Sequence, residues 1–165
     1  MSYIIGEYPS ERRKMTKGEI DQIVALYRQL FEQHQERAEA INYNWFDLML
    51  EANHLWLAQK DEAIVSMGFL IPNQKPIITE TFGGIHDIVT DKEHRGKVQN
   101  GQSLAEIILK KMIEFAKLHR FKYLELTSAP SRAAANRLYQ NLGFRPIAHA
   151  NMGERGATNL YRLYL

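Results

Sequence analysis

The sequence predicts one mixed α/β domain spanning residues 1–165. Apolar residues recur at helical spacing in the first part of the chain, at strand-like spacing between about 55 and 90, and at helical spacing again from 104. No repeat, low-complexity segment or linker divides the 165 residues, and 45% of them are apolar, as in ordinary globular proteins. The expected order is two helices, three strands, a helix, a strand, a helix and two strands.

Two helices are expected at the start. Thr16 and Glu19 have the spacing of a capping box, in which each side chain bonds the other residue's backbone N–H. Apolar residues then follow at helical spacing from Ile20 to Phe31. Asn44, with Asp47 three residues later, indicates the start of a second helix that carries an apolar segment.

The middle of the chain changes to strands at 55–58, 64–71 and 77–90. The breaks between them are short and polar or proline-containing, which favours antiparallel hairpins. A long amphipathic helix from Leu104 to about Arg120 follows.

A strand at 123–127 comes after this helix. Because a helix separates it from the preceding strand, the two strands are expected to be parallel neighbours. Ser131 is expected to cap a last helix, and Gly143 to end it in the C′ position. Two strands near 147–150 and 160–165 complete the chain.

Charge and composition argue against several classes of protein. The 21 basic and 19 acidic residues leave a net charge of only +2, too little to indicate a nucleic-acid partner. No cysteine is present, which excludes a disulfide framework and a cysteine nucleophile. No apolar run approaches the roughly 20 residues that span a bilayer, no signal peptide is evident, and no histidine pair has metal-ligand spacing. A cytoplasmic protein with no membrane partner and no metal is expected.

The segment from His94 to Leu104 forms a turn between a strand and a helix. Backbone N–H groups at a helix start, together with the helix dipole, bind anions such as a phosphate or pyrophosphate. Residues 96–103 nearly fit the nucleotide P-loop, but Gln102 occupies the position of its lysine. Glycines that serve turn geometry alone are a further alternative.

The strand, the Arg95-Gly96-Lys97 turn, the long helix, the next strand and the segment Leu138-Tyr139-Gln140-Asn141-Leu142-Gly143-Phe144 together resemble the GNAT family of acyl-CoA N-acyltransferases. The resemblance covers about 84–144. It implies a central, mostly antiparallel sheet with one parallel pair splayed around the coenzyme site and about four flanking helices. It also implies acetyl-CoA as co-substrate.

In that family the turn follows R-G-x-G-x-G/A and its backbone holds the coenzyme pyrophosphate. Arg95 and Gly96 match, but Val98 stands where glycine is expected and Gly101 comes one residue late. The loop therefore either takes another path through Asn100 and Gly101 or binds the coenzyme more weakly. The resemblance implies coenzyme contacts from Val89, Thr90, Arg95, Gly96, Lys97, Val98, Asn100, Gly101, Gln102, Ser103, Arg132 and Tyr139.

The resemblance also implies catalytic roles. Tyr139 matches the tyrosine that protonates the departing thiolate, although a core tyrosine on the helix stripe is the alternative. His86 or Asp87 would accept the proton of the amine, directly or through water. The alternative for His86 is a satisfied core or lining residue. In a regular strand the two face opposite sides, and a bulge would exchange the faces beyond it.

These observations predict an N-acetyltransferase that transfers an acetyl group from acetyl-CoA to a primary amine of a small molecule or peptide by direct attack. The acceptor would be bound by Tyr43, Trp45, Phe46 and His86, residues that ordinary core packing would also explain. The alternative is a coenzyme-A-binding or interaction module of the same fold with little or no turnover. A homodimer is possible, since members of this family often dimerise.

Overall fold

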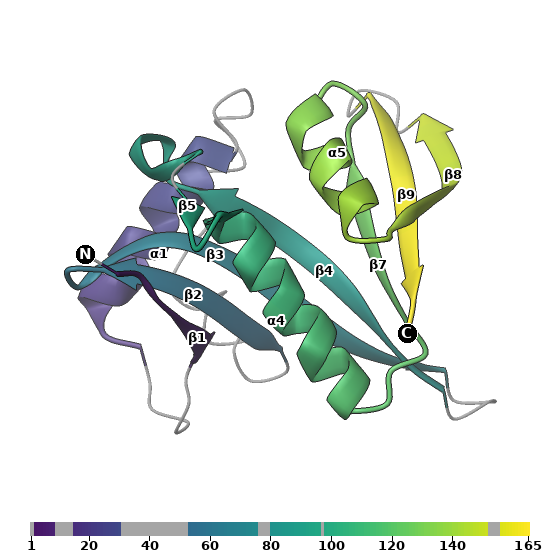
Figure 1. The fold of residues 1–165 in the computed structure, drawn as a ribbon, viewed down its shortest axis with the longest axis horizontal. Helices are drawn as coiled ribbons and strands as arrows, with labels where there is room; N and C mark the ends of the chain where they lie inside the picture. Colours follow the sequence, from purple (N-terminus) through teal and green to yellow (C-terminus); the bar gives the residue numbers. More distant parts are fainter. Residues whose placement is uncertain (1, 9–14, 31–52, 76–79, 97, 152–155) are drawn as a thin grey trace. The chain divides into compact units, whose positions relative to one another are not determined.

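The computed structural model describes residues 2–8, 15–30, 53–75, 80–96, 98–151 and 156–165 (Figure 1). A mixed sheet of seven strands, in the order β1-β2-β3-β4-β7-β9-β8, and a two-stranded β5-β6 ribbon make up the β-structure. The prediction of a mixed α/β fold is confirmed. The strands are β1 (Ile4–Tyr8), β2 (His54–Lys60), β3 (Ala63–Lys75), β4 (Glu80–Thr90), β5 (Val98–Gln99), β6 (Gln102–Ser103), β7 (Tyr123–Ser128), β8 (Arg145–Asn151) and β9 (Ala157–Tyr164), and the helices are α1 (Lys17–Leu30), the 3-10 helix η1 (Lys92–His94), α4 (Leu104–Leu118) and α5 (Ala133–Asn141).

The chain forms two compact units. The first comprises Met1–Ile71 and Asp87–Met112, and the second comprises Pro72–His86 and Ile113–Leu165. The expected second helix, from Asn44 onwards, lies outside the described residues.

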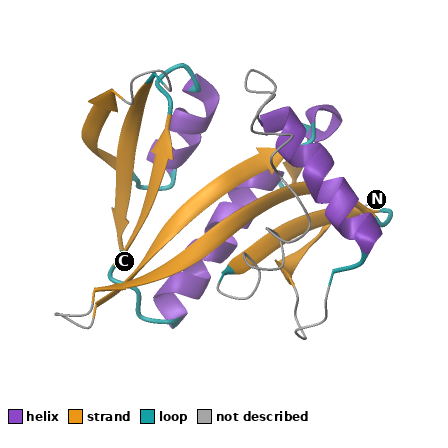
Figure 2. Cartoon of the chain, turned by 180° about the vertical axis from the view of Figure 1, so that it is seen from behind, coloured by secondary structure: helices purple, strands orange, loops and turns teal. Residues whose placement is uncertain are grey.

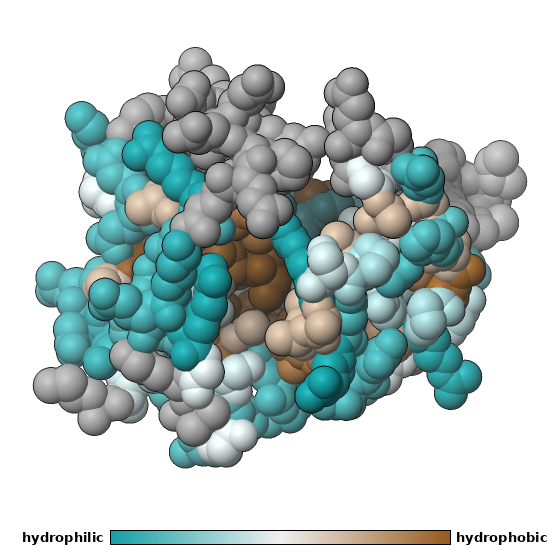
Figure 3. Space-filling model, turned by 90° about the horizontal axis from the view of Figure 1, so that it is seen from above, coloured by the Kyte–Doolittle hydropathy of each residue, from teal (hydrophilic) through white to brown (hydrophobic). Residues whose placement is uncertain are grey.

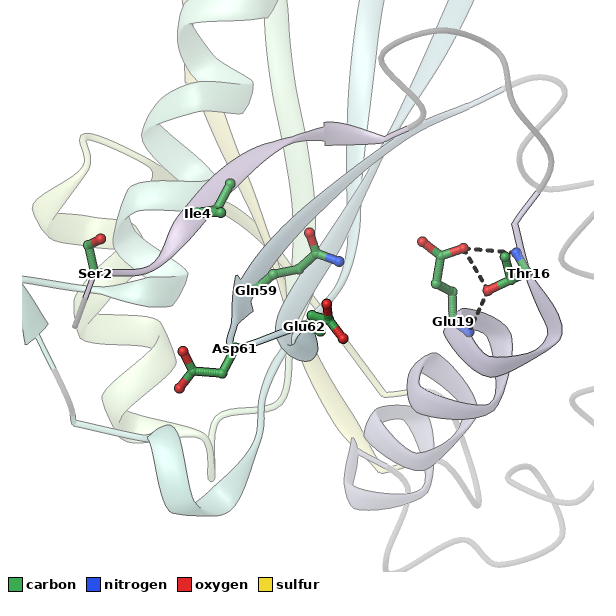
Figure 4. A pocket seen from close by; sticks show the side chains of 7 residues that line it. All are labelled: Ser2, Ile4, Thr16, Glu19, Gln59, Asp61 and Glu62. Atoms are coloured by element: carbon green, nitrogen blue, oxygen red, sulfur yellow. Dashed lines mark hydrogen bonds between the residues drawn. The ribbon is translucent and has the colours of Figure 1, made fainter.

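In the first unit, α1 begins with the predicted capping box. The Glu19 backbone N–H donates to Oγ1 of Thr16 at 3.2 Å, and the Thr16 N–H donates to the Glu19 carboxylate at 2.8 Å (Figure 4). Both donors would otherwise lack a partner at the helix start. The apolar side of α1 then packs on the strands in one buried cluster, whose members are Met15, Ile20, Ile23, Leu26, Tyr27, Leu55, Leu57, Ile64, Met67, Phe69 and Val89.

In the first unit, β2 forms antiparallel pairs with β1 and with β3. β2 and β3 are antiparallel, and the turn between them places both Asp61 and Glu62 at positive φ, the conformation of a two-residue primed turn. β1 pairs antiparallel with β2 and is an element that the sequence did not predict. Its five residues contain a central Gly6 and no clear alternation, so the local pattern is weak.

The second unit contains the predicted parallel pair. Gly83 and Gly84 of β4 are the Cα partners of Leu124 and Glu125 of β7, which confirms the crossover. On its other edge β7 pairs antiparallel with β9, and β9 pairs with β8. α5 lies against the sheet in this unit, with the ring centroids of Tyr139 and Tyr161 6.0 Å apart (Figure 2).

The two ends of α5 differ in how well the sequence predicted them. Ser131 does not cap the helix: Arg132 holds the N-cap position without a side-chain bond. Instead, Nδ2 of Asn136 reaches back to the Ala129 carbonyl at 3.0 Å and so stabilises the entry from within the helix. The other end is as predicted, because Gly143 has a φ of +92° at C′.

Replacing Gly143 with alanine is expected to lower the free energy of unfolding by roughly 1–2 kcal/mol, since a side chain disfavours the left-handed conformation. The added Cβ would also lie 3.3 Å from Cδ1 of Leu163. Urea unfolding measures the change.

Gly18→Ala is the matched control. Gly18 lies in the first turn of α1, and an added Cβ would meet nothing within 4 Å. Because alanine is the better helix former, this variant should be unchanged or more stable by about 0.5 kcal/mol. Equal effects at the two positions would contradict the assignment of Gly143 as a left-handed cap.

Candidate functional site

The loop between β4 and α4 is a small hairpin. Val98 and Gln99 of β5 pair with Ser103 and Gln102 of β6, and the turn joining the two strands has φ values of +54° at Asn100 and +77° at Gly101. Asparagine and glycine are the residues that a type I′ turn prefers, since both positions need positive φ. The structure therefore takes the path through Asn100 and Gly101.

This path removes the conformational difficulty expected at Val98. The valine lies in a strand and is absent from the described residues with positive φ, whereas Gly96 has a φ of +70°. A β-branched residue suits the extended backbone of a strand. The departure from the glycine pattern is thus accommodated without strain at residue 98. Lys97 lies outside the described residues.

The start of α4 offers backbone donors next to the hairpin. Oγ of Ser103 accepts the Glu106 N–H at 3.3 Å, which makes Ser103 the capping side chain. The N–H groups of Leu104 and Ala105 have no acceptor within a helix that begins at Leu104. The Glu106 carboxylate accepts from Nε2 of Gln102 and pairs with Lys110 at 2.8 Å. An anion at the helix start would therefore meet a carboxylate whose charge is already paired.

α1 fixes the entry to this loop. Nε2 of Gln29 donates to Oδ2 of Asp91 at 2.6 Å, and Oε1 of Gln29 accepts the Lys92 N–H at 2.9 Å. The hydrogen bond from Gln29 is the main cause that lowers the pKa of Asp91; burial opposes it, and the hydrogen bond from the Glu93 N–H adds to the lowering. Asp91 therefore stays ionised at neutral pH and caps η1.

The backbone expected to contact the pantetheine arm already has partners. The Ser66 hydroxyl donates to the Val89 carbonyl at 2.9 Å and lies 2.8 Å from the Thr90 hydroxyl. Nε of Arg95 donates to the Thr90 carbonyl at 2.9 Å, although Arg95 is itself exposed. A ligand that used the Thr90 carbonyl would share it with Arg95.

β4 leaves the extended conformation at Asp87, whose φ is +52°. Such a residue interrupts the alternation of faces, as in the bulge that the sequence analysis considered. The Tyr27 hydroxyl donates to Oδ2 of Asp87 at 2.7 Å. Tyr27 is only 2% exposed, and burial, followed by the charge of Asp87 and this hydrogen bond, raises its pKa well above the ordinary value. The phenol therefore keeps its proton and fixes the carboxylate.

His86 is exposed, in contrast to the half-buried Asp87. The imidazole of His86 lies beside Gly84, two residues earlier in the strand: a Cβ added to Gly84 would stand 2.6 Å from Nε2 of His86. Glycine at position 84 thus leaves the space that the imidazole occupies. Asp87 belongs to the first unit and His86 to the second.

The second unit also holds Tyr139 and Arg132. Tyr139 is 8% exposed, and its ring centroid lies 6.3 Å from that of Phe144 and 6.0 Å from that of Tyr161. Burial is the main cause that raises the pKa of Tyr139, while the positive charge of Arg132 lowers it in part. The turn at Gly143 fixes the helix end, since the Phe144 N–H donates to the Tyr139 carbonyl at 3.0 Å. The phenol is consequently protonated at neutral pH.

Two residues near the candidate site were missed as site residues. Tyr27 was predicted only as an apolar position of the first helix, and Gln29 was not singled out at all. Their contacts to Asp87 and Asp91 join residues that are 60 and 62 positions apart in the chain, so no local sequence pattern predicts these contacts. A hydroxyl on a core stripe was the one available signal for Tyr27. Tyr43, Trp45 and Phe46 lie outside the described residues, and their predicted role in acceptor binding stays a prediction.

A separate hollow of about 560 Å³ lies in the first unit, lined by residues that the sequence analysis did not assign to a site. Figure 4 shows it between the start of β1, the β2–β3 turn and the capping box of α1. Its lining residues are Ser2, Ile4, Thr16, Glu19, Gln59, Asp61 and Glu62.

Hydrophilic side chains cover much of the face drawn in Figure 3. Among the described helices, none combines the length and apolar character needed to cross a bilayer. Within the described ranges, no three His, Cys, Asp or Glu side chains are grouped to hold a metal ion.

Comparison with known proteins identifies the family. Residues 20–144 match the model of the acetyltransferase (GNAT) family. Human N-acetyltransferase 8B is 27% identical over 90 residues, which are 54% of this chain but only 37% of that relative. A GNAT-family acetyltransferase from Streptococcus pneumoniae shares the fold, with a TM-score of 0.74, 18% identity and 99% of each chain covered. A GNAT-family acetyltransferase from Elizabethkingia anophelis with acetyl-CoA bound gives a TM-score of 0.64 and 18% identity, covering 99% of this chain and 98% of that one. The family model spans most of the chain, from within α1 to Phe144 just after α5, and this protein belongs to the GNAT acetyltransferase family.

Proposed function

We propose that this protein transfers an acetyl group from acetyl-CoA to a primary amine of a small molecule or peptide, by direct attack of the amine. The observation that carries the proposal is Tyr139, a buried phenol with a raised pKa in the helix that matches the end of the family model. A core position on the α5 stripe needs an apolar ring, whereas a hydroxyl there suits donation to a leaving group.

The residues around the β4–α4 loop fit a pyrophosphate. The hairpin brings Gly96 at positive φ, the exposed guanidinium of Arg95 and the first-turn N–H groups of α4 into one segment. Backbone donors and a helix start are what a phosphate anion needs. In this proposal Arg95, Gly96, Lys97, Val98, Asn100, Gly101, Gln102 and Ser103 hold the pyrophosphate, while Val89, Thr90 and Arg132 contact the remainder of the coenzyme.

Acetyl-CoA supplies an activated thioester when bound. Asp87 or His86 accepts the proton that the amine loses as its nitrogen forms the new C–N bond. Tyr139 donates to the sulfur as the C–S bond breaks, so that the coenzyme leaves as the thiol. Because the nitrogen loses one proton and the sulfur gains one, the base and Tyr139 return to their starting states by exchanging a proton with solvent.

A coenzyme-binding module with little turnover is the second candidate. The observation that favours it is the Thr90 carbonyl, which accepts from Arg95 and stands in the strand proposed to align the pantetheine arm. A module of this kind would retain coenzyme binding at the loop and lack productive alignment of the thioester.

Thiol release from acetyl-CoA, measured with a panel of small amines and peptide N-termini, separates the two candidates. Acetyl transfer predicts amine-dependent release together with coenzyme A binding by calorimetry. Binding with no release from any amine would favour the module. Absence of both at millimolar coenzyme would contradict each candidate.

Tyr139→Phe is expected to lower kcat by about 10²-fold and to change the Kd for coenzyme A by less than about threefold, because only the proton donor is removed. Since the pKa of Tyr139 is raised, its deprotonation should not produce a fall in wild-type activity below about pH 10.

Tyr161→Phe is the matched control for this variant. It removes a hydroxyl from a neighbouring ring that is 2% exposed and lies 6.0 Å from Tyr139. The control should retain wild-type turnover. A Tyr139→Phe enzyme as active as the control would remove Tyr139 from the acid role.

Asp87→Asn is expected to reduce kcat by about 10²-fold, since an amide cannot accept the proton. Asparagine tolerates positive φ and can still accept from Tyr27, so the backbone at residue 87 should survive. His86→Gln is the comparison variant, and it should keep the wild-type kcat. A fall in kcat in His86→Gln alone would assign the base to His86.

A further inference from the structure

Tyr3 makes two hydrogen bonds to the loop between β4 and α4. Its backbone N–H donates to Oε1 of Gln99 at 2.7 Å, and its hydroxyl lies 3.1 Å from Nδ1 of His94. The Tyr3 and His94 rings also meet edge to face, with centroids 5.9 Å apart at 82°. All three residues belong to the first unit. More than 90 residues separate Tyr3 from both partners, so these contacts tie the start of the chain to the loop.

The two contacts fall on opposite sides of the candidate anion-binding segment. His94 ends η1 directly before Arg95 and Gly96, and Gln99 is the last residue of β5 before the Asn100–Gly101 turn. Tyr3 therefore contacts both the residue before Arg95 and the residue after Val98.

The surroundings of Tyr3 fix its orientation. Ser2 and Ile4, the residues on either side of it, line the hollow shown in Figure 4, while the Tyr3 hydroxyl meets the loop. Alternate residues of an extended chain point in opposite directions, which accounts for this division. Nζ of Lys60 stands 6.0 Å from the centre of the Tyr3 ring, at the range where a cation is attracted to an aromatic face.

We propose that Tyr3 is a positioning residue for coenzyme binding, which holds the loop in the conformation that receives the pyrophosphate. The inference rests on the proposed function, because it requires this loop to be the coenzyme site. A loop that is ordered before the ligand arrives loses less conformational freedom on binding. Tyr3 need not touch the coenzyme to raise its affinity.

Tyr3→Phe tests the contact to His94 and preserves the ring. A neutral hydrogen bond contributes enough to predict a rise of about three- to tenfold in the Kd for coenzyme A by calorimetry. KM for the acyl donor should rise by the same factor, with kcat at saturation unchanged. A variant that merely unfolded more easily would lower the active fraction and hence kcat, so this division separates positioning from stability.

Tyr8→Phe is the matched control in the adjoining strand. The Tyr8 hydroxyl donates to Glu19 at 3.4 Å, in the region of the capping box. The same chemical change at Tyr8 should leave the Kd for coenzyme A unaltered. Equal Kd values for wild type, Tyr3→Phe and Tyr8→Phe would overturn the proposal.

His94→Ala completes a double-mutant cycle. If Tyr3 acts through His94, Tyr3→Phe should add no further loss of affinity in the His94→Ala background. Independent, additive losses would overturn the bridge to His94. Wild-type protein that binds coenzyme A but releases no thiol would defeat acetyl transfer while leaving the cycle measurable. Wild-type protein that does not bind coenzyme A at millimolar concentration would defeat the positioning role together with the proposed coenzyme site.

Discussion

Asp87 takes a left-handed backbone conformation within β4, and the buried hydroxyl of Tyr27 from α1 donates to its carboxylate. A non-glycine residue at positive φ is costly, and aspartate is among the side chains that tolerate it best. The hydroxyl of Tyr27 needs an acceptor because it is buried, and Asp87 supplies one at 2.7 Å. Each residue therefore stabilises a feature of the other that would be unfavourable alone.

β4 ends at Thr90, three residues after this contact. Two residues after Asp87, Val89 returns to the buried cluster on the α1 side, and Thr90 and Asp91 then lead into η1. Gln29, in the same helix as Tyr27, bonds Asp91 and the Lys92 N–H. α1 thus bonds both the left-handed residue of β4 and the first residues of the loop. This helix therefore positions the start of the candidate coenzyme site.

The turns of this loop need residues at positive φ, and those residues need not be glycines at the positions of the family pattern. Gly96, Asn100 and Gly101 take the left-handed conformations, and Val98 lies in extended backbone between them. The one-residue displacement of glycine follows from a hairpin with a two-residue turn. Sequence reasoning left open whether the loop takes the path through Asn100 and Gly101 or binds the coenzyme more weakly, because the path depends on strand pairing and on contacts from Tyr3. Local patterns predicted the capping box at Thr16 and the cap at Gly143. The order of elements predicted the parallel pair, because a helix separates the two strands. Ser131 was misassigned because Asn136 stabilises the start of α5 from inside the helix, and β1 was missed because its residues acquire their pattern only beside β2.

The electrostatics of Tyr139 bear on what an acid at this position can do. An ordinary tyrosine is already a weaker acid than a thiol, and burial weakens it further, so the transfer of its proton costs more than it would from an exposed phenol. A hydrogen bond donated while negative charge develops on sulfur avoids this difficulty, since the donor helps the transition state without giving up its proton early. Arg132 acts in the opposite direction to burial, because its charge favours the phenolate. Burial and the charge of Arg132 therefore act in opposite directions on the pKa of the proposed acid.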